Sequence, residues 1–241
     1  MEALLRWRTS PQELIPPERF ILLAEETGLI IPIGEWVLRT ACRQFKRWQN
    51  EGLPSFRVSV NISARQIRHP DFVENVAKIL VETRFDPHCL DIELTESTIM
   101  ENPTESCEVL MRLKELGVGL SIDDFGTGYS SLSYLNNFPL DRIKIDRSFV
   151  KEITSHLDNA AIDTAIIAMS HSLGLRVIAE GVETETQLEM LRAKSCHEVQ
   201  GFLFAHPLAA DEIPNFLRSF RLRSNLPIGW AKTPSVSLPA Q

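Results

Sequence analysis

Seven short apolar segments of the sequence each place a polar or charged side chain near their C-terminal end. Side chains alternate across a β-strand, so the apolar residues of such a segment can face one way while the polar residues face the other. Carboxylate and amide oxygens gathered in this way are the ligands that Mg²⁺ and Mn²⁺ prefer. The candidate ligands are Glu2, Asn61, Glu93, Asp123, Asp124 and Glu180.

One carboxylate at a strand end is usually solvated at the rim of a sheet. Several buried together repel one another so strongly that cations must compensate them, which favours a metal site. The tandem Asp123-Asp124 is the most informative pair, because neighbours on a strand face opposite ways. For both to bind metal the backbone must turn, and the glycines of Phe125-Gly126-Thr127-Gly128 allow this. One aspartate could then bridge two ions while its neighbour holds the second.

Lys144 lies between Ile143 and Ile145 and belongs on the same inner face. It can serve as a counter-ion for the carboxylates, or it can orient a metal-bound water or meet a phosphate, and both roles are compatible. The segment Gly126–Ser131 is rich in glycine but lacks the Gly-Lys-Ser/Thr ending of a P-loop. It predicts a mobile loop beside the site rather than a phosphate cradle.

Composition excludes several classes of protein. The net charge of −7 and the pI near 5.4 argue against binding a nucleic-acid polymer or an anionic membrane by electrostatics. No apolar run approaches the ~18 residues that a membrane span needs, so we expect no membrane segment. The four cysteines have no C-x-x-C spacing, which favours reduced thiols and a cytoplasmic location. The histidines and serines show no catalytic-triad pattern.

Strand-like and helix-like segments alternate along the chain, which predicts an α/β barrel. Such a barrel closes with eight strands, yet only seven are found and the first begins at residue 2. We expect the chain to lack about one N-terminal strand, and the open edge to pair with another chain or with the chain's own tail. The barrel is assigned to residues 1–220 and an irregular tail to 221–241. The expected strands are 2–6, 58–61, 90–93, 120–124, 143–145, 177–180 and 199–200, and the expected helices are 16–28, 34–50, 71–84, 104–116, 157–173, 184–193 and 211–219.

Seven motifs in this order resemble the EAL-domain phosphodiesterases of bacterial cyclic-di-GMP signalling, over residues 1 to about 219. The motifs are Glu2–Trp7, Val60–Ser63, Glu93–Ser97, Asp123–Ser131, Lys144–Arg147, Ala179–Thr184 and Gln200–Gly201. The resemblance implies a TIM-type (β/α)₈-like barrel that uses two Mg²⁺ or Mn²⁺ ions to open cyclic-di-GMP to linear pGpG.

The resemblance also implies a role for each matched residue. Glu2, Asn61, Glu93 and Asp123 match ligands of the first metal, and Asp123 and Asp124 those of the second. The other matches with a catalytic role are Lys144 (which holds the attacking water), Glu180 (general base or water-mediated metal partner), Glu183 (support) and Glu96 (anchor of the loop 124–131). The matches that contact substrate are Arg6, Gln200 and Asp146.

Partners follow from the same resemblance. Besides cyclic-di-GMP they are a second copy of the chain, bound through the loop around 124–131, and upstream sensory or cyclase domains in a longer parent protein that could be membrane-anchored. One alternative is a weak or inactive receptor for cyclic-di-GMP, but such receptors usually lack a ligand, the lysine or the base, and all are present here. The other is a barrel of the enolase type, against which Asn61 and the tandem aspartates speak.

Overall fold

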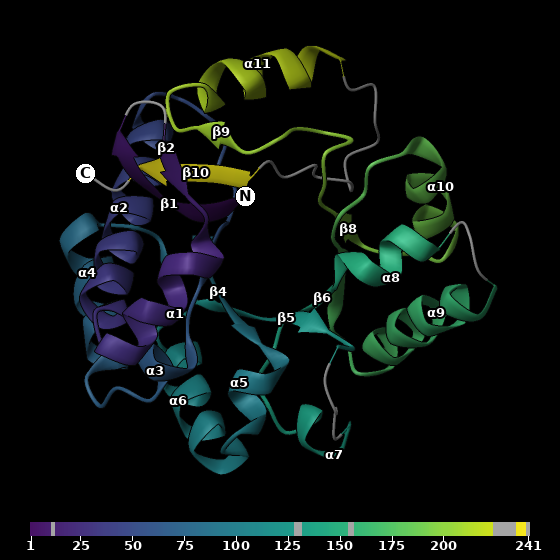
Figure 1. Cartoon of the computed structure of the whole chain (residues 1–241), viewed down its shortest axis with the longest axis horizontal. Helices are drawn as coiled ribbons and strands as arrows, with labels where there is room; N and C mark the ends of the chain where they lie inside the picture. Colours follow the sequence, from purple (N-terminus) through teal and green to yellow (C-terminus); the bar gives the residue numbers. More distant parts are fainter. Residues whose placement is uncertain (11–12, 128–131, 154–156, 224–234, 240–241) are drawn as a thin grey trace.

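The structure, a computed structural model, describes residues 1–10, 13–127, 132–153, 157–223 and 235–239. A ring of strands lies at the centre of the molecule and helices surround it (Figure 1). This confirms the predicted α/β, TIM-type architecture. The strands that carry the predicted site are β1 (Glu2–Ser10), β3 (Val58–Asn61), β4 (Leu90–Thr95), β5 (Gly119–Phe125), β6 (Arg142–Ile145), β7 (Arg176–Ala179) and β8 (Glu198–Val199).

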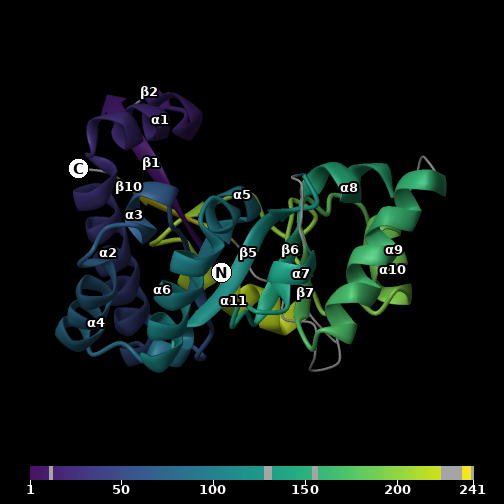
Figure 2. The ribbon, with the colours of Figure 1, turned by 90° about the horizontal axis from the view of Figure 1, so that it is seen from below.

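The sheet is almost entirely parallel. Its strand order is β8-β7-β6-β5-β4-β3-β1-β10-β9, with β9 at Leu208–Ala209 and β10 at Ser235–Pro239. Among the described strands only β2 (Glu13–Ile15) runs antiparallel, against the far end of β1. It lies with helix α1 (Pro17–Thr27) at one end of the molecule (Figure 2). Among the described residues no pairing joins β8 to β9, so the sheet is open there. Parallel strands end at the same edge, which brings the polar residues of successive strands together.

The long helices lie close to their predicted bounds. They are α1 (Pro17–Thr27), α2 (Ile30–Asn50), α4 (Phe72–Thr83), α6 (Pro103–Glu115), α9 (Leu157–Ser172), α10 (Glu185–Ala193) and α11 (Ile213–Arg223). Pro103 begins α6, and Thr184 forms a capping box with Gln187 at the start of α10. Sequence analysis missed the short elements, which have too few residues to show a helical period. These are α3 (Ala64–Ile67), α5 (Glu96–Met100), α7 (Leu132–Leu135), α8 (Arg147–Glu152) and the 3₁₀ helix η1 (Pro87–Cys89).

The predicted alternation across the strands is confirmed. The apolar residues of β3, β4 and β5 are buried in one continuous core with the helices outside the ring, and the polar residues that alternate with them face its interior. Fully buried outward side chains include Val58, Val60, Ile92, Leu120 and Ile122. This apolar layer supplies the burial that stabilises the barrel, so the interior is free to carry charge.

The C-terminal segment differs from the prediction. The predicted boundary at residue 220 falls within α11, and residues 235–239 of the supposedly irregular tail form β10 (Ser235–Pro239). This strand lies parallel between β1 and β9, with Glu2 opposite Ser235 and Arg6 opposite Pro239. The outer edge of β1 offers unpaired backbone groups, and Ser235-Val-Ser-Leu238 alternates with the period of a strand. Sequence analysis expected that edge to pair with another chain or with the chain's own tail, and in the structure it pairs with the tail.

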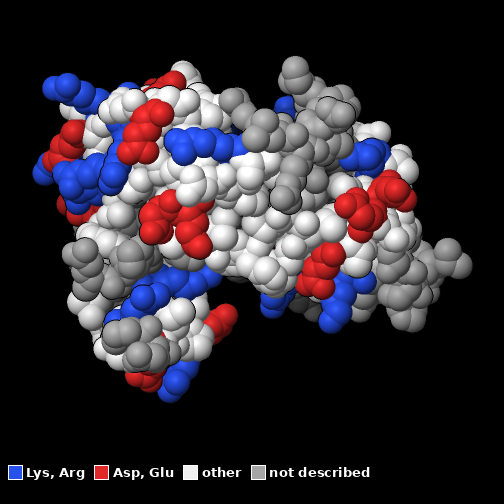
Figure 3. Space-filling model, turned by 90° about the horizontal axis from the view of Figure 1, so that it is seen from above, with Lys and Arg blue, Asp and Glu red and all other residues white. Residues whose placement is uncertain are grey.

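No helix within the described ranges combines the length and the apolar character needed to cross a bilayer. On the face seen in Figure 3, acidic and basic side chains lie near one another around a largely uncharged area, and they do not form one extended basic surface.

Truncating the chain before residue 235 should lower the melting temperature by several degrees and increase hydrogen exchange in β1, because β1 would lose its pairing with β10. Differential scanning calorimetry and amide exchange of the two forms measure this. Removal of residues 240–241 alone serves as the control. Equal melting temperatures and equal exchange of β1 in the long and short forms would contradict the assigned pairing.

Candidate active site

One lysine lies at the centre of the carboxylates inside the barrel. The Nζ atom of Lys144 on β6 is 2.8 Å from Glu93 on β4, 3.1 Å from Asp123 on β5 and 3.7 Å from Glu2 on β1. It is also 2.7 Å from Glu180, which directly follows β7. The Lys144 side chain is only 1% exposed. The strand ends therefore bring four carboxylates around one buried ammonium group.

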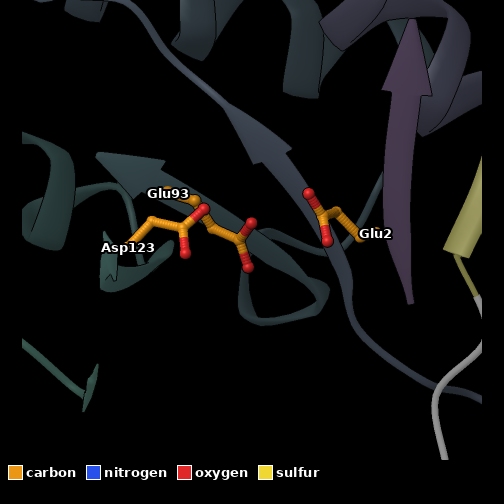
Figure 4. Close-up of side chains that lie close together, drawn as sticks. All are labelled: Glu2, Glu93 and Asp123. Carbon is orange, nitrogen blue, oxygen red and sulfur yellow. The ribbon is translucent and has the colours of Figure 1, made fainter. Parts of the chain in front are cut away.

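Three of the predicted metal ligands converge. Carboxylate oxygens of Glu2, Glu93 and Asp123 all lie within 4.8 Å of one another, and the three side chains point toward a common centre from β1, β4 and β5 (Figure 4). Neutral amides orient the first of them: Asn61 donates to Glu2 at 2.7 Å and Gln200 donates to its other oxygen at 2.6 Å. Asn61 and Gln200 are therefore at the site, and both contact Glu2.

Electrostatics differ between the members of this cluster. Burial alone would lower the pKa of Lys144, but the surrounding carboxylates outweigh it and hold this pKa well above its ordinary value. Burial alone would raise the pKa of Glu2, but Lys144 and the hydrogen bonds from Gln200 and Asn61 keep it below its ordinary value. The surroundings therefore favour the protonated form of Lys144 and the ionised form of Glu2.

The pKa values of Glu93 and Glu180 change in the opposite direction to that of Glu2. Burial raises the pKa of Glu93 well above its ordinary value, because attraction by Lys144 is opposed by repulsion from Glu2 and Asp123. Burial likewise raises the pKa of Glu180 to about 7, against Lys144, with Asp123 and Glu2 adding to the increase. One lysine thus does not neutralise the cluster, so further positive charge at this position would be stabilising.

The chain turns at the tandem aspartates, as predicted. Asp124 has a φ of 53°, in the left-handed region, and the register between β5 and β6 shifts between Ile122 and Phe125. The Asp124 amide donates to the Asp123 carboxylate at 2.9 Å. Burial and the neighbouring Asp123 and Asp146 raise the pKa of the Asp124 carboxyl. Of the two aspartates near the end of β5, Asp123 is therefore buried in the carboxylate cluster and Asp124 is exposed.

Glu96 anchors the start of the loop that follows. Its buried carboxylate accepts a hydrogen bond from the Gly126 amide at 3.1 Å, and Gly126 itself has a φ of 96°. A residue with a Cβ would be strained in this conformation. Residues 128–131, the rest of the loop predicted to reach a dimer interface, lie outside the described residues.

A cavity of about 280 Å³ opens beside the carboxylate cluster. Its walls include four predicted site residues in addition to Glu2, namely Arg6, Glu180, Glu183 and Gln200. Asp146 is not among the lining residues and instead caps α8, accepting from the Ser148 amide at 3.0 Å. A substrate contact by Asp146 thus stays a prediction, and its structural role is the helix cap.

Sequence analysis gave no role to several residues of the cavity wall, among them an arginine and a phenylalanine. Arg147, the first residue of α8, lines the cavity, as does Phe202, whose ring lies 4.3 Å from that of His206 between centroids. Arg147 is the last residue of the motif Lys144–Arg147, and Phe202 directly follows the motif Gln200–Gly201. This position in or beside a motif was the available signal, but only the fold shows which of these residues line the cavity.

The sequence matches the EAL domain family model over residues 1–207. The chain therefore belongs to the EAL-domain family. It is 46% identical over 213 residues to the bifunctional diguanylate cyclase/cyclic di-GMP phosphodiesterase MucR of Pseudomonas aeruginosa, covering 88% of this chain and 31% of that protein. It is 45% identical to the cyclic di-GMP phosphodiesterase NbdA of the same organism, covering 95% of this chain and 29% of that protein.

The fold agrees with this membership. A solved structure described as the PaMucR phosphodiesterase in complex with c-di-GMP superposes with a TM-score of 0.85 at 47% identity, covering 88% of this chain and 86% of that one. The chain spans only about three tenths of the length of the two curated relatives.

The metal-free protein should become less stable as the pH rises from about 4.5 to about 7. Glu180 has a pKa of about 7 in the folded state against an ordinary value of 4.5, so the folded state binds the proton more tightly than the unfolded state does, and this stabilisation is lost on ionisation. Glu180→Gln should therefore raise the melting temperature at about pH 8 more than at about pH 5. Exposed Glu189→Gln is the control, and an equal effect of Glu180→Gln at both pH values would contradict the assignment.

Proposed function

We propose that this domain hydrolyses cyclic di-GMP to linear pGpG with the help of two Mg²⁺ or Mn²⁺ ions. The observation that carries the proposal is the set of four carboxylates around Lys144, beside a cavity large enough to receive part of a nucleotide. Relatives named as cyclic di-GMP phosphodiesterases, and a solved relative in complex with c-di-GMP, support the choice of substrate.

The donor set fits divalent ions. Four carboxylates face one ammonium group, which leaves an excess of negative charge in a buried position when all are ionised. The raised pKa values of Glu93 and Glu180 reflect this excess. Oxygen ligands in this number suit Mg²⁺ and Mn²⁺. The residues that would hold the ions are Glu2, Asn61, Glu93, Asp123 and Asp124, with Asp123 shared between them.

Two such ions would supply charge stabilisation for the phosphodiester and make water more acidic. The chain's own residues then have distinct tasks. The carboxylate of Glu180, 2.7 Å from the Lys144 ammonium group, accepts a proton from the attacking water as general base. Lys144 donates hydrogen bonds from a fixed position and orients that water against Glu180, 2.7 Å away.

The cavity wall positions the substrate. Arg6 and Arg147 line one cavity with Glu180, and guanidinium groups there would bind phosphate oxygens. Gln200, Asn61 and the buried position keep the Glu2 carboxylate in one orientation. Glu183, exposed at the mouth, and Glu96, through its hydrogen bond to Gly126, support the site from outside.

The wider setting of the domain is also a proposal. The curated relatives are about three times longer than the matched region, in keeping with regulatory or cyclase domains attached to this one. Dimerisation through the loop around 124–131 stays a prediction. So does a cytoplasmic location, which would place the site together with its nucleotide substrate.

Asp123→Asn should abolish measurable pGpG formation, because a single carboxylate is proposed to serve both ions. The fold should persist, since the amide has the same shape, and circular dichroism checks this. The assay is chromatographic detection of pGpG from cyclic di-GMP with Mn²⁺.

Two comparisons make this test specific. Asp211→Asn, at an exposed position, should leave turnover unchanged. Near wild-type turnover by Asp123→Asn would refute the two-ion proposal, whereas cyclic di-GMP binding without cleavage by the wild-type chain would instead support the receptor alternative.

Glu180→Gln should separate catalysis from binding. If Glu180 accepts the proton from water, kcat should fall by ~10²-fold or more, the usual scale of general-base help. Affinity for cyclic di-GMP, measured by calorimetry with Ca²⁺ in place of Mn²⁺, should change far less. An equal loss of affinity and rate would make Glu180 chiefly a binding residue.

A further inference from the structure

A second polar cluster lies inside the barrel next to the candidate active site. Asp91 on β4 accepts hydrogen bonds through one oxygen, Oδ2, from two neighbours: Ser121 Oγ on β5 at 2.8 Å and Arg142 Nη1 on β6 at 3.2 Å. All three residues are at most 3% exposed. The interior of such barrels is normally filled by branched apolar side chains, so a buried ion pair here requires an explanation.

The position of this cluster relates it to the site. Asp91, Ser121 and Arg142 each precede a site residue of the same strand by two positions, Glu93, Asp123 and Lys144 respectively. Residues two apart on a strand face the same side. One carboxylate oxygen of Asp91 therefore connects the three strands β4, β5 and β6. The connection lies two residues before the side chains that form the centre of the site.

The pairing of β5 with β6 shows why a connection at Ser121 and Arg142 matters. Between β5 and β6 the regular register is Ser121 opposite Arg142 and Ile122 opposite Ile143, after which it shifts and resumes only at Phe125. The interruption contains Asp123 and Asp124, the latter with positive φ. The contact of Ser121 and Arg142 with Asp91 thus lies at the end of the regular pairing, immediately before the segment that carries the tandem aspartates.

Energetics argue against a purely stabilising role. A buried ion pair often contributes no more to stability than apolar side chains of similar volume, and its best-attested use is to specify register. The surroundings are shaped for this pair: a Cβ atom on Gly119 would lie 2.6 Å from Asp91 Oδ1 and 3.2 Å from Arg142 Nη1. A larger residue at position 119 would displace the contact.

We propose that Asp91, Ser121 and Arg142 form a positioning clamp that fixes the register of β5 before its irregular turn and thereby sets the metal affinity of Asp123 and Asp124. The inference rests on the proposed metal-binding function of these aspartates. None of the three clamp residues lines the substrate cavity, so they act through the residues above them.

The test replaces the clamp by apolar side chains of similar size in the variant Asp91→Leu/Ser121→Ala/Arg142→Met. The melting temperature should stay the same or rise, while calorimetry should show Mn²⁺ affinity at least tenfold weaker. The Mn²⁺ concentration for half-maximal turnover should rise by the same factor. Exchange of the Asp124 amide, which donates to Asp123, should become faster. A folded triple variant with wild-type Mn²⁺ affinity and wild-type Asp124 exchange would overturn the proposal.

The matched control is Lys114→Met. Lys114 forms another ion pair at the start of β6, with Asp141 at 2.8 Å, but on the outside of the barrel and one-third exposed. Its loss should not alter Mn²⁺ affinity. If the triple variant fails to fold, Ser121→Ala alone removes the hydrogen bond from Ser121 to Asp91 and leaves the ion pair between Asp91 and Arg142. This single variant should still weaken Mn²⁺ binding. Unchanged Mn²⁺ binding would overturn the clamp. Wild-type protein that binds Mn²⁺ but forms no pGpG would count against the proposed function alone.

Discussion

The burial of one ammonium group among four carboxylates is the constraint on which the rest of the molecule depends. Lys144 contacts side chains from four different parts of the chain, on β1, β4, β5 and directly after β7. Such an assembly requires strands that run in parallel, end at one edge of the sheet and place their polar residues on the same face. It also requires a continuous apolar layer outside, because the interior adds electrostatic repulsion rather than hydrophobic stabilisation.

The same constraint explains why neutral and charged groups are mixed around the cluster. Amides from Asn61 and Gln200 hold Glu2 in its ionised form without adding charge. Among the described residues no side-chain amide donates to Glu93 or Glu180, and burial raises the pKa values of both. The protein thus keeps carboxylates of different proton affinity within one site, a condition that suits metal binding at some positions and proton transfer at others.

Local patterns in the sequence were sufficient for much of this arrangement. The alternation along residues 58–61, 90–93 and 120–124 predicts both the apolar outer face and the inward carboxylates, and adjacent aspartates followed by glycine predict a turn. Contacts that depend on strand register could not be predicted in this way. They include the hydrogen bond of Gln200 to Glu2, the sharing of Asp91 by Ser121 and Arg142, the cavity position of Arg147, and the residue register of β10 against β1.

The bond between Gln200 and Glu2 joins residues 198 positions apart. Contacts of such separation carry a large loop-closure entropy and form late in folding. During synthesis, β1 emerges from the ribosome long before the segment that orients its glutamate. The nascent chain can build the β3–β6 part of the sheet first, and Glu2 then becomes fixed only after nearly the whole domain has been translated. An incomplete chain that ends before Gln200 therefore lacks the amide that orients Glu2.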